Sequence, residues 1–390
     1  MYFSSSDFDL LDEASFRDFL DYKLSEFYYL DYKRTIEYNA YFKQEFLKDV
    51  SAFANAFGGN LIYGVDEPKE NVTVEDQIYG VDNADDTIKK FEKLAQTGLD
   101  PRIPGLKMKS INIKGKKPVI VAHIPPSISK PHMISIECDK KGLFYIRGTE
   151  SNIPMNTQQI RSAVMETYNT ESRVLNTLIE KEAEFKNYEL AKETTFFFQA
   201  IPLVNTPPEK TIHETDVRKA FKLIKGNDGY DLGVGHKFSP IMQGVKAEYN
   251  YSDYYTHIFN IQHNGYMESI LKTTPYYIPQ NNPNIKVIPV SKDSPSAKYF
   301  NSILKLTDDL INELRLDYPF LLSCKLFNTK ELMFKGEFNS SVYERPIMRF
   351  SQITRSIGSS ALKVAHNRWL SEFFHAFGQY PPTELLLQDD

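Results

Sequence analysis

Apolar positions in the first half of the chain follow a helical repeat that stops at a pair of glycines. In residues 41–57, five apolar side chains share one helical stripe: Phe42, Phe46, Val50, Phe53 and Ala54. Gly58 and Gly59 follow, and glycine takes the left-handed conformation that ends many helices. The apolar run 60–66 then has the composition of a buried strand. This order predicts a helix packed against a sheet.

The flanking segments continue the mixture of helix and strand. An amphipathic pattern over 14–30 runs into a short strand at 30–35. Further on, the pattern predicts helices at 84–97 and 156–168 and strands at 108–113, 117–124 and 144–149. Since no doubly wound repeat of strand and helix is present, the fold class is α+β, with a mixed sheet and helices.

The second half predicts a separate domain. A mixed-polarity helical pattern covers 158–192, strands are expected at 193–204, 254–262 and 319–327, and an amphipathic helix at 298–316. We therefore divide the chain into a domain at 1–165, a connecting helix at 166–192 and a second α+β domain at 193–390. No motif in this second domain distinguishes dimerisation, partner binding and ligand sensing.

Composition narrows the class of protein. Hydrophobic residues make up 41% and charged residues 25% of the chain, which is typical of a globular protein. With only Cys138 and Cys324, neither a disulfide framework nor a cysteine-rich zinc site can form. The acidic first residues do not have the order of a secretory signal, and no apolar stretch is long enough to cross a bilayer. We expect a cytoplasmic protein without membrane association.

Charge is unevenly distributed along the first domain. Residues 1–84 contain 7 Lys and Arg against 17 Asp and Glu, whereas residues 85–150 contain 13 against 7. An acidic segment next to a basic one suits a site that holds cations on one side and a phosphate backbone on the other. Solvated faces of a folded domain give the same pattern, so the charges alone do not decide.

Glycines in this region do not form a nucleotide site. No Gly-Lys-Ser or Gly-Lys-Thr follows Gly58-Gly59, and the helix precedes the glycines instead of following them. The sequence therefore predicts no nucleotide cofactor.

The chain also contains an ordered set of short motifs: Glu26-x4-Asp31-Tyr-Lys33, the run 50–67 (VSAFANAFGGNLIYGVDE), Lys-Pro-His at 130–132, and 144–149 (FYIRGT).

This set resembles the AlbA-like nucleic-acid-binding domain of the Schlafen family over residues ~20–165. In that family the pattern runs Glu-x4-Glu-Phe-Lys, then Ser-Ala-Phe-Ala-Asn-x-x-Gly-Gly-x-Leu-x-x-Gly-Val-Asp, then Lys-Pro-His and Tyr-x-Arg-x-Gly. The resemblance implies a nucleic-acid-binding protein of microbial type. In the nucleolytic members, two acids of the first motif and one after the Gly-Val strand form the centre that cleaves transfer RNA and other structured RNA.

Carried over residue by residue, the resemblance assigns catalysis to Glu26, Asp31 and Asp66, with Glu67 as the competing third acid. It implies a divalent-metal-dependent endoribonuclease, used in antiviral or stress responses. Asp31 stands where the family usually has Glu, and this shorter acid would reach less far toward a metal. Because many relatives are described only as DNA-binding, a non-catalytic DNA-binding transcriptional regulator is the alternative.

The residues themselves allow this chemistry under one structural condition. Glu26 and Asp31 lie an odd number of residues apart, so in a strand they would face opposite ways, and a bend must lie between them. Converging carboxylates repel one another, and Mg²⁺ or Mn²⁺ relieves the repulsion through oxygen ligands. Lys33 would neutralise charge developing on a phosphate. We thus expect metal ligation by Glu26, Asp31 and Asp66 and catalysis by the same acids with Lys33.

Basic residues provide the expected contacts to the nucleic-acid backbone. These are Lys114, Lys116, Lys117, Lys140, Lys141 and Arg147. For Arg147, near the end of its strand, the sequence leaves a second possibility, an ion pair with a core acid. No second copy of the motifs is present, so a pair of AlbA-like lobes would have to come from a homodimer.

Overall fold

The computed structural model describes most of the chain. The described residues are 3, 8, 10–69, 71–149, 151–204, 211–223, 235–252, 255–277, 285–289, 295–314, 316, 319–335, 341–355 and 360–387. They divide into two compact units, Met1–Glu171 and Ser172–Asp390. None of the helices in the described part is long and apolar enough to cross a membrane. Each unit combines helices with sheets, so the α+β class is confirmed.

Unit 1 is built on a four-stranded mixed sheet in the order β1-β2-β5-β4. Its strands are β1 (Leu30–Lys33), β2 (Gly59–Tyr63), β4 (Lys107–Ile111) and β5 (Val119–Ile124). β1 and β2 are parallel, and the other two pairs are antiparallel. Short strands complete the unit: β3 (Leu99–Asp100) with β6 (Met133–Ile134), and β7 (Tyr145–Arg147) with β8 (Asn152–Pro154).

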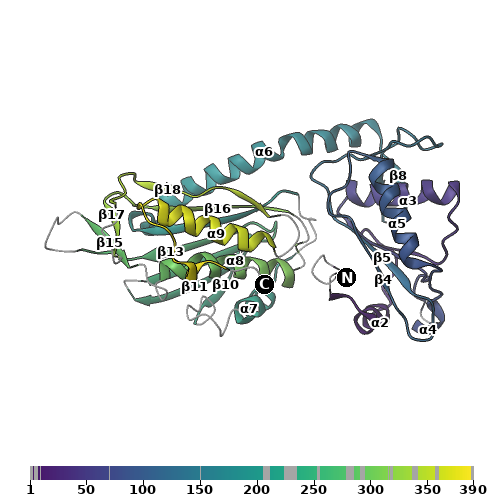
Figure 1. Ribbon diagram of the computed structural model, residues 1–390, viewed down its shortest axis with the longest axis horizontal. Coiled ribbons are helices and arrows are strands. Elements are labelled where there is room, and N and C mark those ends of the chain that lie inside the picture. The colour runs from purple at the N-terminus through teal and green to yellow at the C-terminus, as the bar shows by residue number, and fades with distance from the viewer. Residues whose placement is uncertain are drawn as a thin grey trace. The chain divides into compact units, whose positions relative to one another are not determined.

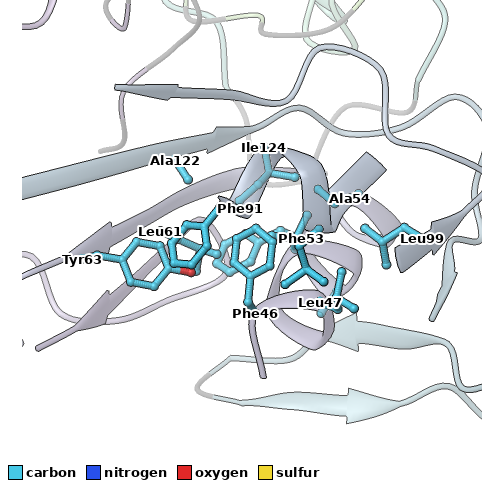
Figure 2. Packing of buried hydrophobic residues seen from close by; sticks show 14 of the residues in the cluster. Phe46, Leu47, Phe53, Ala54, Leu61, Tyr63, Phe91, Leu99, Ala122 and Ile124 are labelled. Carbon is cyan, nitrogen blue, oxygen red and sulfur yellow. The ribbon is translucent and has the colours of Figure 1, made fainter. Parts of the chain in front are cut away.

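Helices cover both faces of this sheet (Figure 1). One face packs against α3 (Ala40–Asn55) and α5 (Ala84–Gly98), and the other against α2 (Glu13–Asp21) and α4 (Val74–Gln77). Figure 2 shows Phe46 and Phe53 of α3, Phe91 of α5, and Leu61 and Tyr63 of β2 in the first of these cores. Ile62 belongs to the opposite core, because side chains alternate along a strand. The predicted buried strand at 60–66 is thus confirmed, with apolar residues on both faces.

The amphipathic segment 14–30 was predicted with too long a helix. α2 ends at Asp21, and residues 22–29 lead through a turn into β1. The helical patterns 156–168 and 158–192 form one helix, α6 (Thr157–Lys186), followed by the short 3₁₀ helix η1 (Glu189–Lys192). The hydrophobic pattern located these segments but did not locate where each helix stops, which depends on local caps.

Unit 2 contains a large antiparallel sheet in the order β10-β11-β12-β13-β9-β16-β18, with β19 also paired to β16. These strands are β9 (Thr195–Pro202), β10 (Lys237–Ile241), β11 (Gly244–Ser252), β12 (Tyr255–Gln262), β13 (Met267–Thr273), β16 (Phe320–Phe327), β18 (Ile347–Arg349) and β19 (Ile353–Arg355). The strands expected at 193–204, 254–262 and 319–327 correspond to β9, β12 and β16.

The helices of unit 2 are α7 (Glu214–Leu223), α8 (Pro295–Glu313), α9 (Ser360–His375) and the 3₁₀ helix η2 (Thr383–Leu385). A small sheet joins β14 (Tyr276–Tyr277), β15 (Lys286–Pro289) and β17 (Leu332–Lys335). α8 packs on the large sheet at β13 and contacts both α7 and α9. The helix predicted at 298–316 therefore lies at the centre of the helical layer.

The glycines of the central motif permit close backbone contacts. Gly64 has φ +88°, and a Cβ there would lie 2.8 Å from the Cα of Gly80. Gly59 has φ +146°, and its Cβ would lie 2.4 Å from the carbonyl oxygen of Tyr29, just before β1. Any larger residue would push β2 away from these neighbouring segments, so the motif encodes chain spacing.

We expect Gly64→Ala to destabilise unit 1 far more than Gly115→Ala. Both glycines have a positive φ, +88° and +77°, but a Cβ at Gly115 would have no atom within 4 Å. Backbone strain alone should lower the Tm by about 2–4 °C, and the added clash at Gly64 by about 6–12 °C in total. Calorimetry of the full-length chain measures both shifts; equal shifts would contradict the close-contact role.

Candidate functional site

A tight turn brings Glu26 alongside Asp31. Phe27 and Leu30 exchange backbone hydrogen bonds of 3.0 and 3.1 Å across this turn, so the chain reverses just before β1. Glu26 Oε1 then accepts a 3.1 Å hydrogen bond from the amide of Tyr32. This is the bend that the odd spacing of the two acids required.

Asp31 changes the protonation of Glu26. Burial, the adjacent charge of Asp31 and a hydrogen bond between the two carboxyl groups together raise the pKa of Glu26 to about 7. That hydrogen bond requires a proton on one of the two carboxyl groups. The pair therefore holds a proton that can leave or arrive near neutral pH.

Asp31 is only 2% exposed, and cations surround it. Arg147 Nη1 donates to its Oδ2 at 2.9 Å. Lys33 Nζ lies 2.9 Å from Oδ1 and 3.1 Å from Oδ2, with hydrogen-bond geometry only to Oδ2. Oδ1 is thus buried with the charge of Lys33 beside it but without a hydrogen-bond donor in suitable geometry among the described residues.

Sequence reasoning missed a third acid, Asp49, which is 3% exposed. Its Oδ2 lies 3.6 Å from Lys33 Nζ, and its Oδ1 accepts a 2.6 Å hydrogen bond from Asn152. Burial raises the pKa of Asp49, although Lys33 partly offsets this effect. Lys33 consequently lies between two buried carboxylates, Asp31 and Asp49.

Lys33 remains protonated in this setting. Burial alone would lower the pKa of Lys33, but the charges of Asp49 and Asp31 raise it above its usual value. The Tyr63 hydroxyl is also buried without a hydrogen-bond partner among the described residues. Burial raises the pKa of Tyr63, and the charges of Asp49 and Asp31 add to the increase, so the hydroxyl stays neutral.

A sequence signal for Asp49 was present in the helical stripe. Asp49 lies three residues after Phe46 and four before Phe53, which places it on the buried face of α3. A charged residue on such a face needs a partner in the core. This signal shows that a partner exists but does not show which residue it is.

Asp66 lies apart from the acidic pair. Its Oδ2 is 3.5 Å from Arg34 Nη1, and its amide donates to the carbonyl of Gln77 at 3.0 Å. Glu67, the competing third acid, accepts a 3.0 Å hydrogen bond from the Glu26 amide through its Oε1. In the described part of the chain, no three Asp, Glu, His or Cys residues form a group that could hold a metal. Metal ligation by Glu26, Asp31 and Asp66 therefore stays a prediction.

Arg147 lies in the interior, with its side chain 1% exposed. Besides Asp31, its guanidinium donates to the carbonyls of Phe27 and Leu30 and to Asn152 Oδ1, at 3.0–3.3 Å. It also lies over the ring of Phe53, 4.8 Å from the centroid. Since its donors already have acceptors, the structure favours the ion pair with a core acid over the phosphate contact that was expected of Arg147.

The lysines that were expected to contact phosphate differ in how firmly the protein already holds their side chains. Lys116 donates to the carbonyls of Glu75 and Ile78, and Lys140 pairs with Glu45. Lys117 and Lys141 are exposed and pair with the exposed acids Asp82 and Glu137. Lys114 is exposed too, and its backbone amide donates to Glu13 at 3.0 Å. Exposed ion pairs are weak, so a phosphate can compete for Lys117 and Lys141.

The remaining motif residues build the fold around this site. Asn55, at the end of α3, donates to the carbonyls of Tyr145 and His132 at 2.8 and 3.2 Å and accepts from the His132 amide at 2.7 Å. These bonds connect α3 to β7, the strand that carries Arg147. The backbone bonding expected of a polar residue at this helix end is therefore present.

We expect Arg147→Met to lower the free energy of unfolding of unit 1 by about 3–5 kcal/mol, because Asp31 would keep a buried charge without its main partner. Lys141→Met removes only an exposed ion pair and should cost less than about 0.5 kcal/mol. Urea titration of the full-length variants measures both. A small loss for Arg147→Met would contradict its structural role.

Comparisons with known proteins agree with these motifs. Residues 26–156 match the model of the family described as Schlafen, AlbA_2. A search of curated proteins found no match.

A solved structure similar to this chain is the N-terminal domain of a RecG-related protein from Nitrosomonas europaea, named for an ATP-dependent DNA helicase. The two are 20% identical, the match covers 36% of this chain and 92% of that one, and the TM-score is 0.27, too low to support an argument. The family match spans β1 to β8 and contains both acids of the turn, so this part of the chain is similar to the Schlafen AlbA_2 domain.

Proposed function

We propose that unit 1 binds nucleic acid and cleaves structured RNA, such as transfer RNA, at the Glu26–Asp31 pair. The observation that carries this proposal is the pair itself, in which burial and Asp31 raise the pKa of Glu26 to about 7. A carboxyl group with a pKa near the working pH is an effective general acid or base. The Schlafen AlbA_2 match supports the nucleic-acid substrate.

In the proposed reaction, ionised Glu26 accepts the proton of the attacking hydroxyl, from water or a ribose. The hydroxyl oxygen bonds to phosphorus, the bond from phosphorus to the leaving ribose oxygen breaks, and the leaving oxygen takes up a proton from water. Lys33, which is partly exposed and held by Asp31 and Asp49, stabilises the charge on the phosphate oxygens. Asp31 acts through Glu26 by setting its protonation.

A requirement for Mg²⁺ or Mn²⁺ stays a prediction, and no step above depends on it. Glu26 and Asp31 are the expected ligands that lie together, whereas Asp66 contacts Arg34. The proposal also includes a homodimer and a cytoplasmic location. The role of unit 2 is left open among dimerisation, partner binding and ligand sensing.

The alternative is a non-catalytic DNA-binding regulator. A specific observation favours it: Arg147 and Lys33 neutralise Asp31 inside the domain, as in a structural ion-pair network. In that case the same buried charges would stabilise the turn before β1 without reacting. The two functions differ in whether any cleavage product forms.

We expect Glu26→Gln to abolish RNA cleavage while leaving RNA affinity unchanged or higher, because it removes a negative charge. Wild-type cleavage should rise with pH through about 7, as Glu26 loses its proton. The assay uses purified full-length protein with total small RNA, in Mg²⁺, in Mn²⁺ and in chelator.

The matched control is Asp86→Asn, which changes an exposed acid on α5 and should cleave like wild type. Absence of product with wild type under all three metal conditions would support the regulator. Equal cleavage by Glu26→Gln and wild type would contradict the role of the pair.

Nucleic-acid affinity should fall steeply as salt increases, because lysines displace counterions from the phosphate backbone. Replacing Lys114, Lys117 and Lys141 together by Ala should lower the slope of log K against log salt by about 2–3. Fluorescence anisotropy at several salt concentrations measures the slope. A slope that is zero, or unchanged by the triple substitution, would contradict these contacts.

A further inference from the structure

An arginine stacked on a tyrosine lies directly after β1, on the surface of unit 1. Arg34 is 54% exposed at its side chain, and its guanidinium carbon lies 4.0 Å from the centroid of the Tyr79 ring. Tyr79 is 41% exposed. Holding two long exposed side chains in one arrangement costs conformational entropy, and a fixed backbone beneath them lowers that cost.

The backbone beneath the stack is fixed on both sides. The amides of Tyr79 and Gly80 both donate to the carbonyl of Gly64, at 2.8 and 2.9 Å, and Val65 pairs with Ile78. On the other side, Gly64 donates to the carbonyl of Lys33 at 2.7 Å, which fixes the residue before Arg34. Asp66 Oδ2, 3.5 Å from Arg34 Nη1, completes the arrangement.

An open depression of about 630 Å³ adjoins Tyr79. It is lined by Asp76, Ile78, Tyr79, Gly115, Lys116 and Lys117. Its carboxylate is already engaged, because Asp76 Oδ2 accepts a 2.7 Å hydrogen bond from Thr73. Gly115 has no neighbour within 4 Å of where a Cβ would lie, so the tip of the β4–β5 turn leaves room. Two lysines and an aromatic ring therefore border an accessible space.

The chemistry of these groups matches one unpaired nucleotide. An aromatic ring stacks on any base, because every base has a π-face, and lysines contact the phosphate beside it. A base in a duplex is not free to reach an aromatic ring in this way. Arg34 supports the ring from its stacked position and offers guanidinium donors to a second phosphate.

We propose that Tyr79, Arg34 and Lys117 form a subsite for an unpaired nucleotide of single-stranded RNA. The base stacks on Tyr79, its phosphate contacts Lys117, and Asp66 positions Arg34. This inference rests on the proposed nucleic-acid binding by unit 1 and names a place where it occurs. Asp66, expected to be a metal ligand, thereby has a role in binding.

The position of the subsite has a consequence for the proposed cleavage. Arg34 follows Lys33 in the chain, and Lys33 contacts the acidic pair. A nucleotide on Tyr79 would therefore lie beside Arg34, the residue next to Lys33 in the chain. Structured RNA would be engaged at a loop, bulge or end, where bases are unpaired.

The test compares single-stranded and duplex RNA of matched length. Full-length Glu26→Gln protein, chosen to prevent cleavage, is titrated against labelled 12-nucleotide oligo(U) and a 12-base-pair RNA duplex by fluorescence anisotropy. We expect Tyr79→Ala to weaken oligo(U) binding about tenfold, in the range of stacking losses, and duplex binding by less than about twofold. Tyr79→Phe keeps the ring and should bind like its parent.

The matched control is Tyr168→Ala, which removes an exposed tyrosine from α6. It should leave both affinities unchanged. Arg34→Ala should weaken oligo(U) binding, and adding Asp66→Asn to it should cause no further loss, since Asp66 acts through Arg34. Circular dichroism confirms that each variant folds.

Two results would overturn the subsite while leaving the proposed function intact. One is that Tyr79→Ala binds both RNAs with the same affinities as Tyr168→Ala. The other is an equal loss of oligo(U) and duplex affinity for folded Tyr79→Ala. If the parent protein binds neither RNA, the proposed function and the subsite both fail.

Discussion

The buried charge of Asp31 is the constraint on which the rest of unit 1 depends. A carboxylate that is 2% exposed is tolerated only when nearby cations and donors replace water. Arg147 provides this from β7, and Lys33 provides it from β1 itself. To reach Asp31, β7 must lie against α3, and Asn55 fixes that contact through the carbonyl of Tyr145. The turn before β1 is held by the same guanidinium, through the carbonyls of Phe27 and Leu30. One ion pair thus connects four segments that are distant in the sequence.

This arrangement also limits what the acidic pair can do. Lys33 lies between Asp31 and Asp49, so a positive charge already occupies the space between two of the buried acids. Glu26 differs from them because it is only half-buried and holds a proton near neutral pH. In the proposed reaction the proton acceptor is therefore the more exposed acid, and the buried acids set the electrostatic potential around it. A motif of acids at fixed spacing can in this way contain members with different tasks.

Local signals in the sequence were sufficient for much of unit 1. The stripe from Phe42 to Phe53 and the pair Gly58-Gly59 predicted α3 within two residues and the start of β2 within one, whereas β2 ends three residues earlier than predicted. The bend between Glu26 and Asp31 followed from their odd spacing. Partners distant in the sequence were not predictable: Asp66 with Arg34, and Asp49 with Lys33 and Asn152, depend on how strands align. In unit 2, β10, β11 and β13 were missed, although β11 alternates apolar or aromatic residues with polar ones along its length.

The Asp31–Arg147 pair has a consequence for how sequences of this kind can diverge. Neither residue can be replaced alone without leaving a buried charge, so positions 31 and 147 should change together or not at all. The presence of the arginine in the segment 144–149 then indicates that the buried ion pair is intact, even in a relative that has lost every contact with nucleic acid. In diverging sequences, this arginine would therefore be retained longer than any activity. A relative that keeps Arg147 but has replaced Glu26 would be a folded domain that had been released from catalysis.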